Sequence, residues 1–313
     1  MRILVTGVAR SGTTWVATTL ATTAGAAVLR EPDTVDASAF AMRALRGLGA
    51  NPKVDEQEQG PTDLIRLWDA AFGAPVRYVR GQQRIADAFY ARSSLEERKD
   101  TCHPTSPIVT PSLRVAAALA VPWSGKGTRH QVVKSIRLPF ALEWVSARWR
   151  PAVIVCRRHP LDVVASQFEL GHETDLQWLP PAARAIATER YGVAEPSMYD
   201  LVAGMSWRVA LSMSVLDDAC RAHPEFHVVD HEVLCRYPHA EYRKLFDAIG
   251  LDWSDEVESH IERANRPGEG YETNRIAGEQ SGKWRERMAP DDARVAAGVI
   301  ARFPIAKQYA LDV

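Results

Sequence analysis

The 313-residue sequence has almost no net charge, few cysteines and no long apolar run. With a formal charge of −1 at pH 7, it has no global basic field to attract nucleic acid or an anionic membrane. The four cysteines form no CxxC pair and no metal-ligand spacing, which favours reduced thiols over disulfides or a metal site. No apolar run reaches the roughly 18 residues of a membrane-spanning helix, and no signal peptide stands at the start. We therefore expect a soluble, cytoplasmic protein with no metal, membrane span or nucleic-acid partner; the sequence does not indicate its oligomeric state.

What the sequence does contain is an apolar N-terminal run followed by a turn of small residues. Residues 2–8 read as a short buried strand that stops at Gly7, and residues 15–24 read as a helix rich in Ala, Thr and Leu. At a turn between a strand and a helix, backbone N–H groups converge and the helix dipole adds partial positive charge. The stretch therefore predicts an anion site, and the alternative is an ordinary turn with helix-capping Ser and Thr.

The glycine spacing of this turn is that of a Walker A loop, but the lysine of such a loop is missing. Four residues separate Gly7 from Gly12, and Thr13 stands where a kinase or NTPase carries the Lys that reaches the β- and γ-phosphates. The cation lies before the second glycine instead, as Arg10. A P-loop kinase or NTPase is therefore the disfavoured alternative. A nucleotide-binding protein without catalytic activity is a second one.

Apolar runs and helical stripes alternate over most of the chain, which predicts an α/β fold. Further strands are expected at 26–29, 130–134, 152–156 and 226–229, and helices at 138–149, 162–170, 199–220 and 242–249. This order is typical of a P-loop-like parallel sheet covered by helices on both faces. Residues 33–128 carry no strong strand signal and read as a helical insertion within a single domain that spans 1–313.

A second motif follows the most strand-like run of the chain, residues 152–156. An Arg at the end of a central strand can meet a phosphate with two N–H groups, and Arg158 has that position. Ser166 would then lie about two turns into the helix that follows. The alternative is a solvated charge at the strand end and a polar residue that merely fills a helix face.

Taken together, these motifs resemble those of the sulfotransferases, which use 3′-phosphoadenosine 5′-phosphosulfate (PAPS) as the sulfonate donor. The run RSGTTW from Arg10 to Trp15 resembles their phosphosulfate-binding loop. Arg158 and Ser166 have the spacing of the pair that holds the 3′-phosphate, with His159 in place of the usual Asn or Asp. Residues 278–288 resemble the C-terminal loop that closes over the nucleotide.

The resemblance implies transfer of a sulfonate to the hydroxyl of a small-molecule acceptor, with adenosine 3′,5′-bisphosphate (PAP) as the product. The acceptor could be a carbohydrate, a lipid or a secondary metabolite, bound by the insertion at 33–128, and no metal is required. Arg10 would neutralise charge on the leaving phosphate, and Trp15 would lie near the adenine. The cofactor-binding residues implied are Arg10, Ser11, Gly12, Thr13, Thr14, Trp15, Arg158, Ser166, Arg275 and Lys283.

The candidate catalytic base is Glu31, which follows the second strand. Glu31 and the proline after it resemble the Glu-Pro of bacterial and carbohydrate sulfotransferases, and a carboxylate there could take the acceptor proton. The alternative is a structural Glu paired with Arg30 or Arg10. If Glu31 is not the base, His103 and His130 are the histidines to consider.

Two weaker matches complete the set. Lys134, with an Arg three residues on, resembles a segment of the carbohydrate-type enzymes and would face the sulfonate or the acceptor as a third catalytic residue besides Arg10 and Glu31. Residues 228–234 resemble another family segment, in which we expect Glu232 to have a structural role.

Overall fold

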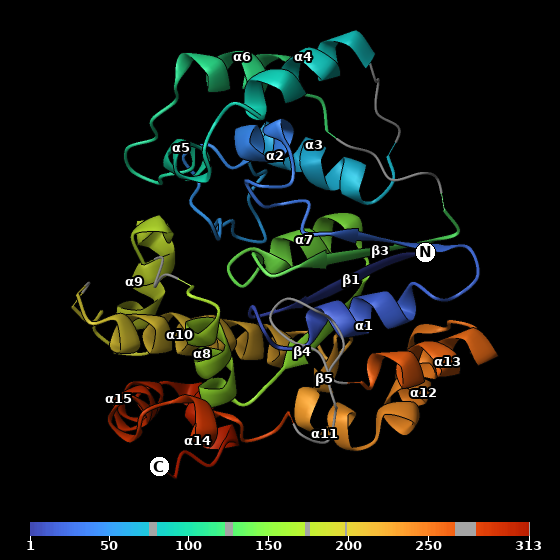
Figure 1. Cartoon of the computed structure of the whole chain (residues 1–313), viewed down its shortest axis with the longest axis vertical. Helices are drawn as coiled ribbons and strands as arrows, with labels where there is room; N and C mark the ends of the chain where they lie inside the picture. The colour runs from blue at the N-terminus through green and yellow to red at the C-terminus, as the bar shows by residue number, and fades with distance from the viewer. Residues whose placement is uncertain (75–79, 123–127, 173–175, 198, 267–279, 313) are drawn as a thin grey trace.

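The computed structural model describes residues 1–74, 80–122, 128–172, 176–197, 199–266 and 280–312. Within these residues, five parallel strands form one sheet in the order β2-β3-β1-β4-β5 (Figure 1). The strands are β1 (Arg2–Gly7), β2 (Ala26–Arg30), β3 (His130–Ser135), β4 (Ala152–Arg157) and β5 (His227–Asp230). The α/β fold expected from the sequence is confirmed, and each strand lies within two residues of its expected position.

The central strand β1 is buried on both faces, which explains why its residues 3–5 are all apolar. Leu4 packs into one hydrophobic cluster with Val133 of β3 and Val153 of β4. Its neighbours Ile3 and Val5 point to the opposite face and belong to a second cluster. Successive side chains of a strand alternate between faces, so a strand with a core on each side is apolar at consecutive positions; the buried Thr6 is the polar exception in β1.

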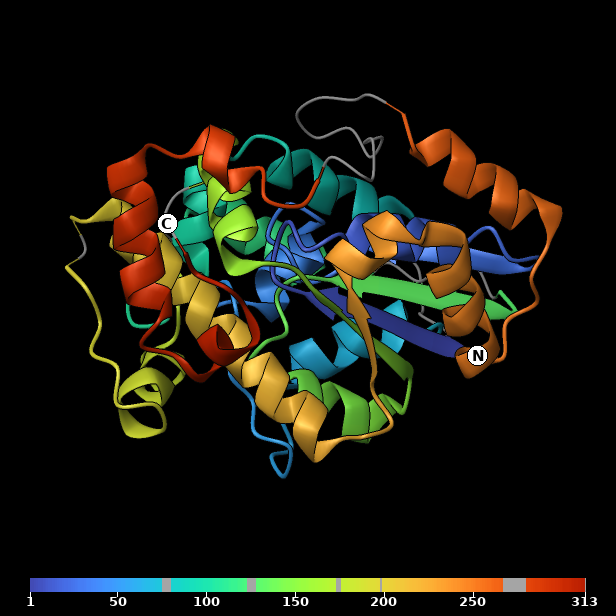
Figure 2. The same cartoon turned by 90° about the horizontal axis from the view of Figure 1, so that it is seen from below.

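Helices cover both faces of the sheet, as expected (Figures 1 and 2). The cluster around Ile3 is closed by α1 (Thr13–Leu20), α12 (Pro238–Ile249) and α13 (Asp255–Ala264). The cluster around Leu4 is lined by α7 (Leu142–Trp149), α8 (Pro160–Glu169), α10 (Leu201–Ala222) and α15 (Pro290–Ile300). None of the helices in the described part of the chain is long and apolar enough to cross a membrane.

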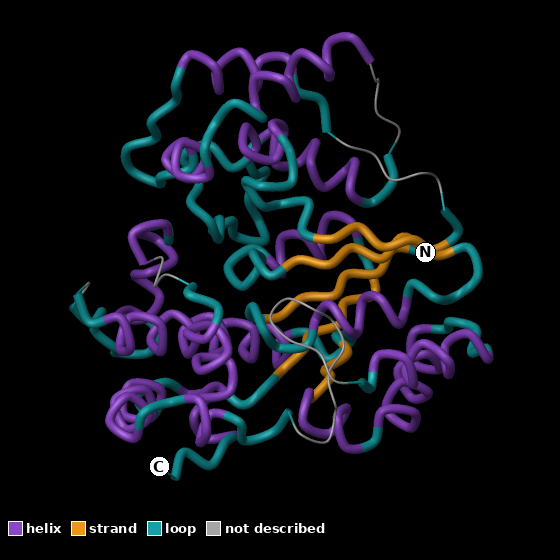
Figure 3. Tube along the Cα trace, in the orientation of Figure 1, coloured by secondary structure: helices purple, strands orange, loops and turns teal. Residues whose placement is uncertain are grey.

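Between β2 and β3, the chain forms a layer of helices above the β2 side of the sheet (Figures 1 and 3). These are α2 (Ala39–Ala44), α3 (Thr62–Ala71), α4 (Arg80–Tyr90), α5 (Leu95–Thr101) and α6 (Pro111–Leu119). Their buried side chains, such as Phe40 and Trp68, share one hydrophobic cluster with β1 and α7. The insertion therefore packs onto the sheet and has no separate core of its own.

Five further short elements complete the described chain. They are η1 (Leu176–Trp178), α9 (Pro181–Glu189), α11 (His231–Arg236), α14 (Trp284–Arg287) and η3 (Pro304–Gln308). One helix begins later than expected: α7 starts at Leu142 rather than Leu138. Pro139 disfavours a helical conformation at the residue before it, so residues 138–141 form a turn instead.

Candidate active site

The loop after β1 depends on two glycines whose conformations other residues rarely adopt. Gly7 has φ 155°, and a Cβ there would lie 2.6 Å from the carbonyl oxygen of Cys156 on β4. Gly12, the N-cap of α1, has φ 85°, and a Cβ there would lie 2.6 Å from Cδ2 of His231. Burial, and secondarily the charge of Arg158, lowers the pKa of His231 to about 3. A neutral imidazole therefore packs against the loop at Gly12. The loop therefore needs Gly at both positions of its Walker-like spacing.

Two carbonyl oxygens of the loop accept hydrogen bonds from the side chains of Arg158 and Gln167. Gln167 Nε2 donates to the carbonyl oxygen of Ala9 at 3.0 Å, and the Arg158 guanidinium donates to that of Arg10 at 2.9 Å. Ser11 N–H closes the turn onto Val8 O at 3.1 Å. No side chain caps α1, so the N–H groups of its first turn have no intrahelical partners and form a place for an anion.

The first two motifs of the sequence meet at this loop. The side chain of Arg10, a residue with φ 75°, donates from Nε to Ser166 Oγ on α8 at 3.0 Å. Ser166 is buried, with an exposed fraction of 1%. A guanidinium and a hydroxyl from distant parts of the chain thus lie together beside the N-terminus of α1.

Arg158 lies deeper, between the loop and the C-terminal segment. Its second terminal nitrogen donates to the carbonyl oxygen of Gln280 at 3.0 Å. Among the described residues, its Nε has no hydrogen-bond partner although the side chain is buried. Burial lowers the pKa of Arg158, which still leaves it charged at neutral pH, so an orphaned donor of a buried cation lies at this site.

One carboxylate links the C-terminal segment at 280–288 to the segment that begins at Arg158. Asp162, at the start of α8, accepts hydrogen bonds from the N–H groups of Gly282 at 2.8 Å and Trp284 at 2.9 Å. Lys283 lies between these two residues, which Asp162 anchors at the start of α8. The other cation expected from this motif, Arg275, lies outside the described residues.

Glu31 and Lys134 form an ion pair at the ends of β2 and β3. Arg30 stands opposite Lys134 in the strand register, which brings Glu31 beside the lysine, and Glu31 N–H donates to the Lys134 carbonyl oxygen at 2.6 Å. The Lys134 side chain is only 6% exposed, whereas that of Glu31 is 32% exposed. Two residues expected to be catalytic are therefore partners, a pairing that the sequence analysis did not anticipate.

The two alternative histidines differ in their positions. His130 begins β3, at the edge of the sheet opposite the one where β1 and β3 end, so it is not placed to act beside the loop. His103 packs edge-on against Trp178, with ring centroids 5.1 Å apart, and its Nδ1 accepts from Ser106 N–H at 3.1 Å. Within the described part of the chain, no group of three His, Cys, Asp or Glu side chains is arranged to hold a metal ion.

The remaining residues named from the sequence lie around the loop. Trp15 packs edge-on against Tyr242 of α12, with centroids 5.4 Å apart. Glu232 accepts a hydrogen bond from His159 N–H at 2.8 Å, which agrees with the structural role expected for it. His159 in turn stacks on Trp284 with an interplanar angle of 11°. Sequence reasoning missed Gln167 altogether, since nothing in its context distinguishes it from a residue on a helix face.

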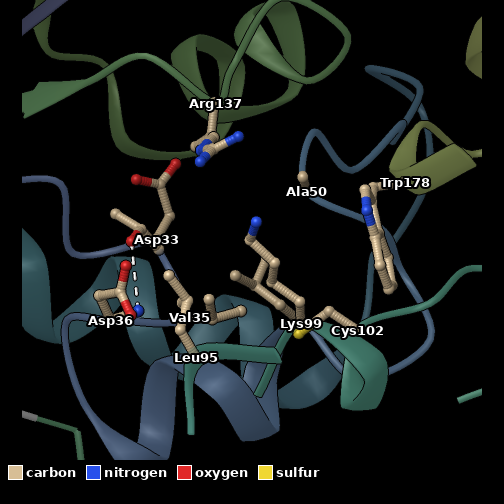
Figure 4. Close-up of a pocket in the computed structure, with 11 residues that line it drawn as sticks. Asp33, Val35, Asp36, Ala50, Leu95, Lys99, Cys102, Arg137 and Trp178 are labelled. Atoms are coloured by element: carbon tan, nitrogen blue, oxygen red, sulfur yellow. Dashed lines mark hydrogen bonds between the residues drawn. The ribbon is translucent and has the colours of Figure 1, made fainter. Parts of the chain in front are cut away.

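A pocket opens between the strand ends and the helical insertion (Figure 4). Asp33, two residues after Glu31, lines it and is itself 1% exposed. Ser135 Oγ donates to Asp33 Oδ2 at 2.6 Å, while Oδ1 has no partner among the described residues. Burial raises the pKa of Asp33 to about 6. The other lining residues are Thr34, Val35, Asp36, Leu45, Ala50, Leu95, Lys99, Cys102, Arg137 and Trp178.

The sheet topology and the loop at its strand ends define a P-loop-like α/β protein. The chain matches the model of the Sulfotransferase family over residues 2–255, and it belongs to that family of sulfonate-transferring enzymes. Among solved structures, sulfotransferase STF9 from Mycobacterium avium is 14% identical, with a TM-score of 0.39; the match covers 97% of this chain and 76% of that one. Comparison with curated protein sequences finds no match.

Proposed function

We propose that the protein transfers the sulfonate of PAPS to the hydroxyl of a small-molecule acceptor and releases PAP. The observation that carries this proposal is the contact between Arg10 and Ser166, which joins the two phosphate motifs at an uncapped helix N-terminus. A Walker lysine, which a kinase would need there, is replaced by Thr13.

The nucleotide has two groups of donors available to it. The N–H groups of residues 12–14 suit the 5′-phosphate, because they surround the positive end of the α1 dipole, whereas that of Ser11 is engaged by Val8 O. The buried Arg158 and Ser166 suit the 3′-phosphate; the orphaned Nε of Arg158 supports this, since a buried cationic donor gains most from an anionic partner. Lys283, and Arg275 outside the described residues, would add charge from the C-terminal loop, and Trp15 would border the adenine.

The reaction is an in-line displacement at sulfur. The acceptor oxygen forms the new S–O bond as the bond to the 5′-phosphate oxygen breaks, and Glu31 takes the acceptor proton. Arg10 stabilises the charge that grows on the leaving phosphate oxygen. When Glu31 becomes neutral, the ammonium of Lys134 loses its partner and can interact with the transferring sulfonate. In this pair, Glu31 thereby accepts the proton and Lys134 stabilises the charge of the sulfonate.

The acceptor would enter from the insertion at 33–128, within a single domain that spans 1–313. Supporting this, the pocket of Figure 4 is lined by residues of the insertion together with Arg137, which follows β3. Its location next to Glu31 would bring an acceptor hydroxyl to the proposed base.

The proposal is tested by calorimetry with PAP and AMP, which differ only in the 3′-phosphate. We expect PAP to bind about 10- to 100-fold more tightly, the worth of one or two charge-assisted hydrogen bonds. Arg158→Ala should remove that preference, and Arg294→Ala, a 65% exposed arginine of α15, should preserve it. Equal affinity of the wild type for PAP and AMP would refute the nucleotide assignment. PAP binding without any sulfonate gain on acceptors, detected by mass, would favour the catalytically inactive alternative.

A further inference from the structure

A buried glutamine of α8 connects the loop after β1 to the helix α10. Gln167 has an exposed fraction of 0%. Its Nε2 donates to the carbonyl oxygen of Ala9 at 3.0 Å, and its Oε1 accepts from a terminal nitrogen of Arg208 on α10. The side-chain amide therefore presents a donor to the loop and an acceptor to the helix.

These two partners leave the amide of Gln167 only one orientation. A guanidinium has donors and no acceptor, and a carbonyl oxygen is only an acceptor. Arg208 must therefore face Oε1, which directs Nε2 to Ala9. A carboxylate at this position could satisfy Arg208 but would place an oxygen against the Ala9 carbonyl, and an apolar side chain could satisfy neither partner. Glutamine is thus matched to the polarity of both.

The hydrogen bond to Ala9 fixes the peptide that precedes Arg10. In a trans peptide the C=O and N–H groups point in opposite directions, so a carbonyl held toward Gln167 directs the Arg10 N–H the other way. Arg10 has φ 75°, a conformation that a residue with a Cβ rarely adopts and that persists only where its surroundings impose it. Its side chain bonds to Ser166 and its carbonyl oxygen accepts from Arg158, so Gln167 is the third side chain that holds this part of the loop.

We propose that Gln167 is a positioning residue, which holds the Ala9–Arg10 peptide so that the Arg10 guanidinium is in place for the 5′-phosphate. Arg208 acts one step further out, because it sets which way the Gln167 amide faces. In this role Gln167 works through Arg10 and not by contact with the nucleotide. The inference rests on the proposed function, which assigns Arg10 to that phosphate.

The first test is Gln167→Met, with PAP affinity measured by calorimetry. Methionine keeps the length of the side chain but cannot donate to Ala9, so other conformations of the loop become populated before PAP binds. Affinity falls with the fraction of molecules in the binding conformation, and one net hydrogen bond corresponds to about 3- to 10-fold. Gln167→Glu keeps an acceptor for Arg208 and thereby protects the fold, and it should weaken PAP binding at least as much.

A double-mutant cycle with Arg10→Ala tests whether Gln167 acts through Arg10. The Arg10→Ala protein keeps the N–H groups of α1 and Arg158, so its PAP affinity can still be measured. Adding Gln167→Met to it should change that affinity by less than about 2-fold, because the side chain to be positioned is already absent. A structural role unrelated to Arg10 would give the same loss in both backgrounds.

Gln83→Met is the matched control. Gln83 of α4 is 8% exposed, and it too bonds at both ends of its amide, to the Asp87 carboxylate and to the Val121 N–H. Its replacement should leave PAP affinity unchanged. The Ser11 N–H, which closes the turn of the loop, reports on the loop without any ligand. Its hydrogen exchange should be faster in Gln167→Met and unchanged in Gln83→Met.

The outcomes separate this inference from the proposed function. Unchanged PAP affinity in both Gln167 variants would overturn the positioning role, and so would equal losses with and without the Arg10 side chain. If the wild type does not bind PAP, the proposed function fails instead. The exchange of the Ser11 N–H still tests the contact in that case, and an unchanged rate in Gln167→Met would show that Gln167 does not hold the loop.

Discussion

Arg10 and Ser166, 156 residues apart in the sequence, are joined by one hydrogen bond of 3.0 Å from Nε to Oγ. The resemblance assigns them to different phosphates of the nucleotide, with Arg10 at the 5′-phosphate and Ser166 at the 3′-phosphate. Their contact means that a change in either one alters the surroundings of the other. In the proposed complex with PAPS, binding of these two phosphates would therefore be coupled through the two side chains.

A double-mutant cycle measures this coupling. Arg10→Ala should lower turnover about 10²- to 10³-fold, since it removes a donor aimed at charge that develops in the transition state. Ser166→Ala should mainly weaken PAP affinity. In the double variant, we expect the losses to be non-additive by about 0.5–3 kcal/mol, as is usual for residues in contact. Strictly additive losses in both PAP affinity and turnover would show that the contact has no functional weight.

Glu31→Gln tests the assignment of the base. Glutamine keeps the shape of the side chain but cannot accept the proton, so turnover should fall about 10²-fold or more while PAP affinity stays within a few-fold. Glu241→Gln is a matched control, because Glu241 also forms a Glu–Lys ion pair, with Lys244 on the surface of α12. Near-normal turnover of Glu31→Gln in a protein of unchanged stability would end the base hypothesis and turn attention to His103.

Asp162→Ala tests the attachment of the C-terminal loop. The substitution leaves the N–H groups of Gly282 and Trp284 without their acceptor, and the cost of such unsatisfied groups is about 1–3 kcal/mol each where they are buried. We expect faster amide hydrogen exchange in residues 280–288 and weaker PAP binding. Asp162→Asn retains one acceptor oxygen, so its amide exchange rates and PAP affinity should lie between those of the wild type and Asp162→Ala. Unchanged exchange in Asp162→Ala would show that other contacts hold this segment.

Asp33→Asn should change how stability depends on pH. Burial raises the pKa of Asp33 from 3.8 to about 6, against the smaller influence of the Ser135 hydrogen bond and of Arg137, with Glu31 adding to the rise. The folded state then holds more protons than the unfolded state between about pH 4 and 6, so this group makes stability fall as pH rises through that window. Above it, the ionised carboxylate costs up to about 3 kcal/mol.

Urea unfolding at several pH values checks this. The free energy of unfolding of Asp33→Asn should exceed that of the wild type at pH 8, and the advantage should shrink toward about pH 4. Parallel curves for the two proteins would mean that Asp33 is not titrating in this range.

The sequence predicts the sheet well because burial leaves a direct trace in it. β1 and β4 face a hydrophobic cluster on each side, so their central residues, 3–5 and 153–155, are apolar, and each strand is followed by a motif whose spacing is local. The loop glycines, Arg10 and the Arg158–Ser166 pair could be found for that reason.

Contacts that depend on strand order cannot be predicted from burial patterns and local spacing. The ion pair of Glu31 with Lys134 exists only because β2 and β3 are neighbours, and their sequences are separated by the whole helical insertion. His130 is the first residue of β3 and lies at the opposite end of that strand from Lys134, where its side chain cannot replace Glu31. Asp33 was not singled out for a similar reason: its hydrogen-bond partner, Ser135, lies at the end of β3.

Arg158 bridges the carbonyl oxygens of Arg10 and Gln280, which are 148 and 122 residues away from it along the chain. A site closed by such distant segments cannot assemble on the ribosome until nearly the entire polypeptide has emerged. Folding must therefore bring together contacts of high sequence separation, a step that is slow compared with the formation of local helices. An enzyme built this way has no activity as a nascent chain. A product truncated before Gln280 retains the N-terminal loop but lacks the carbonyl oxygen to which Arg158 donates.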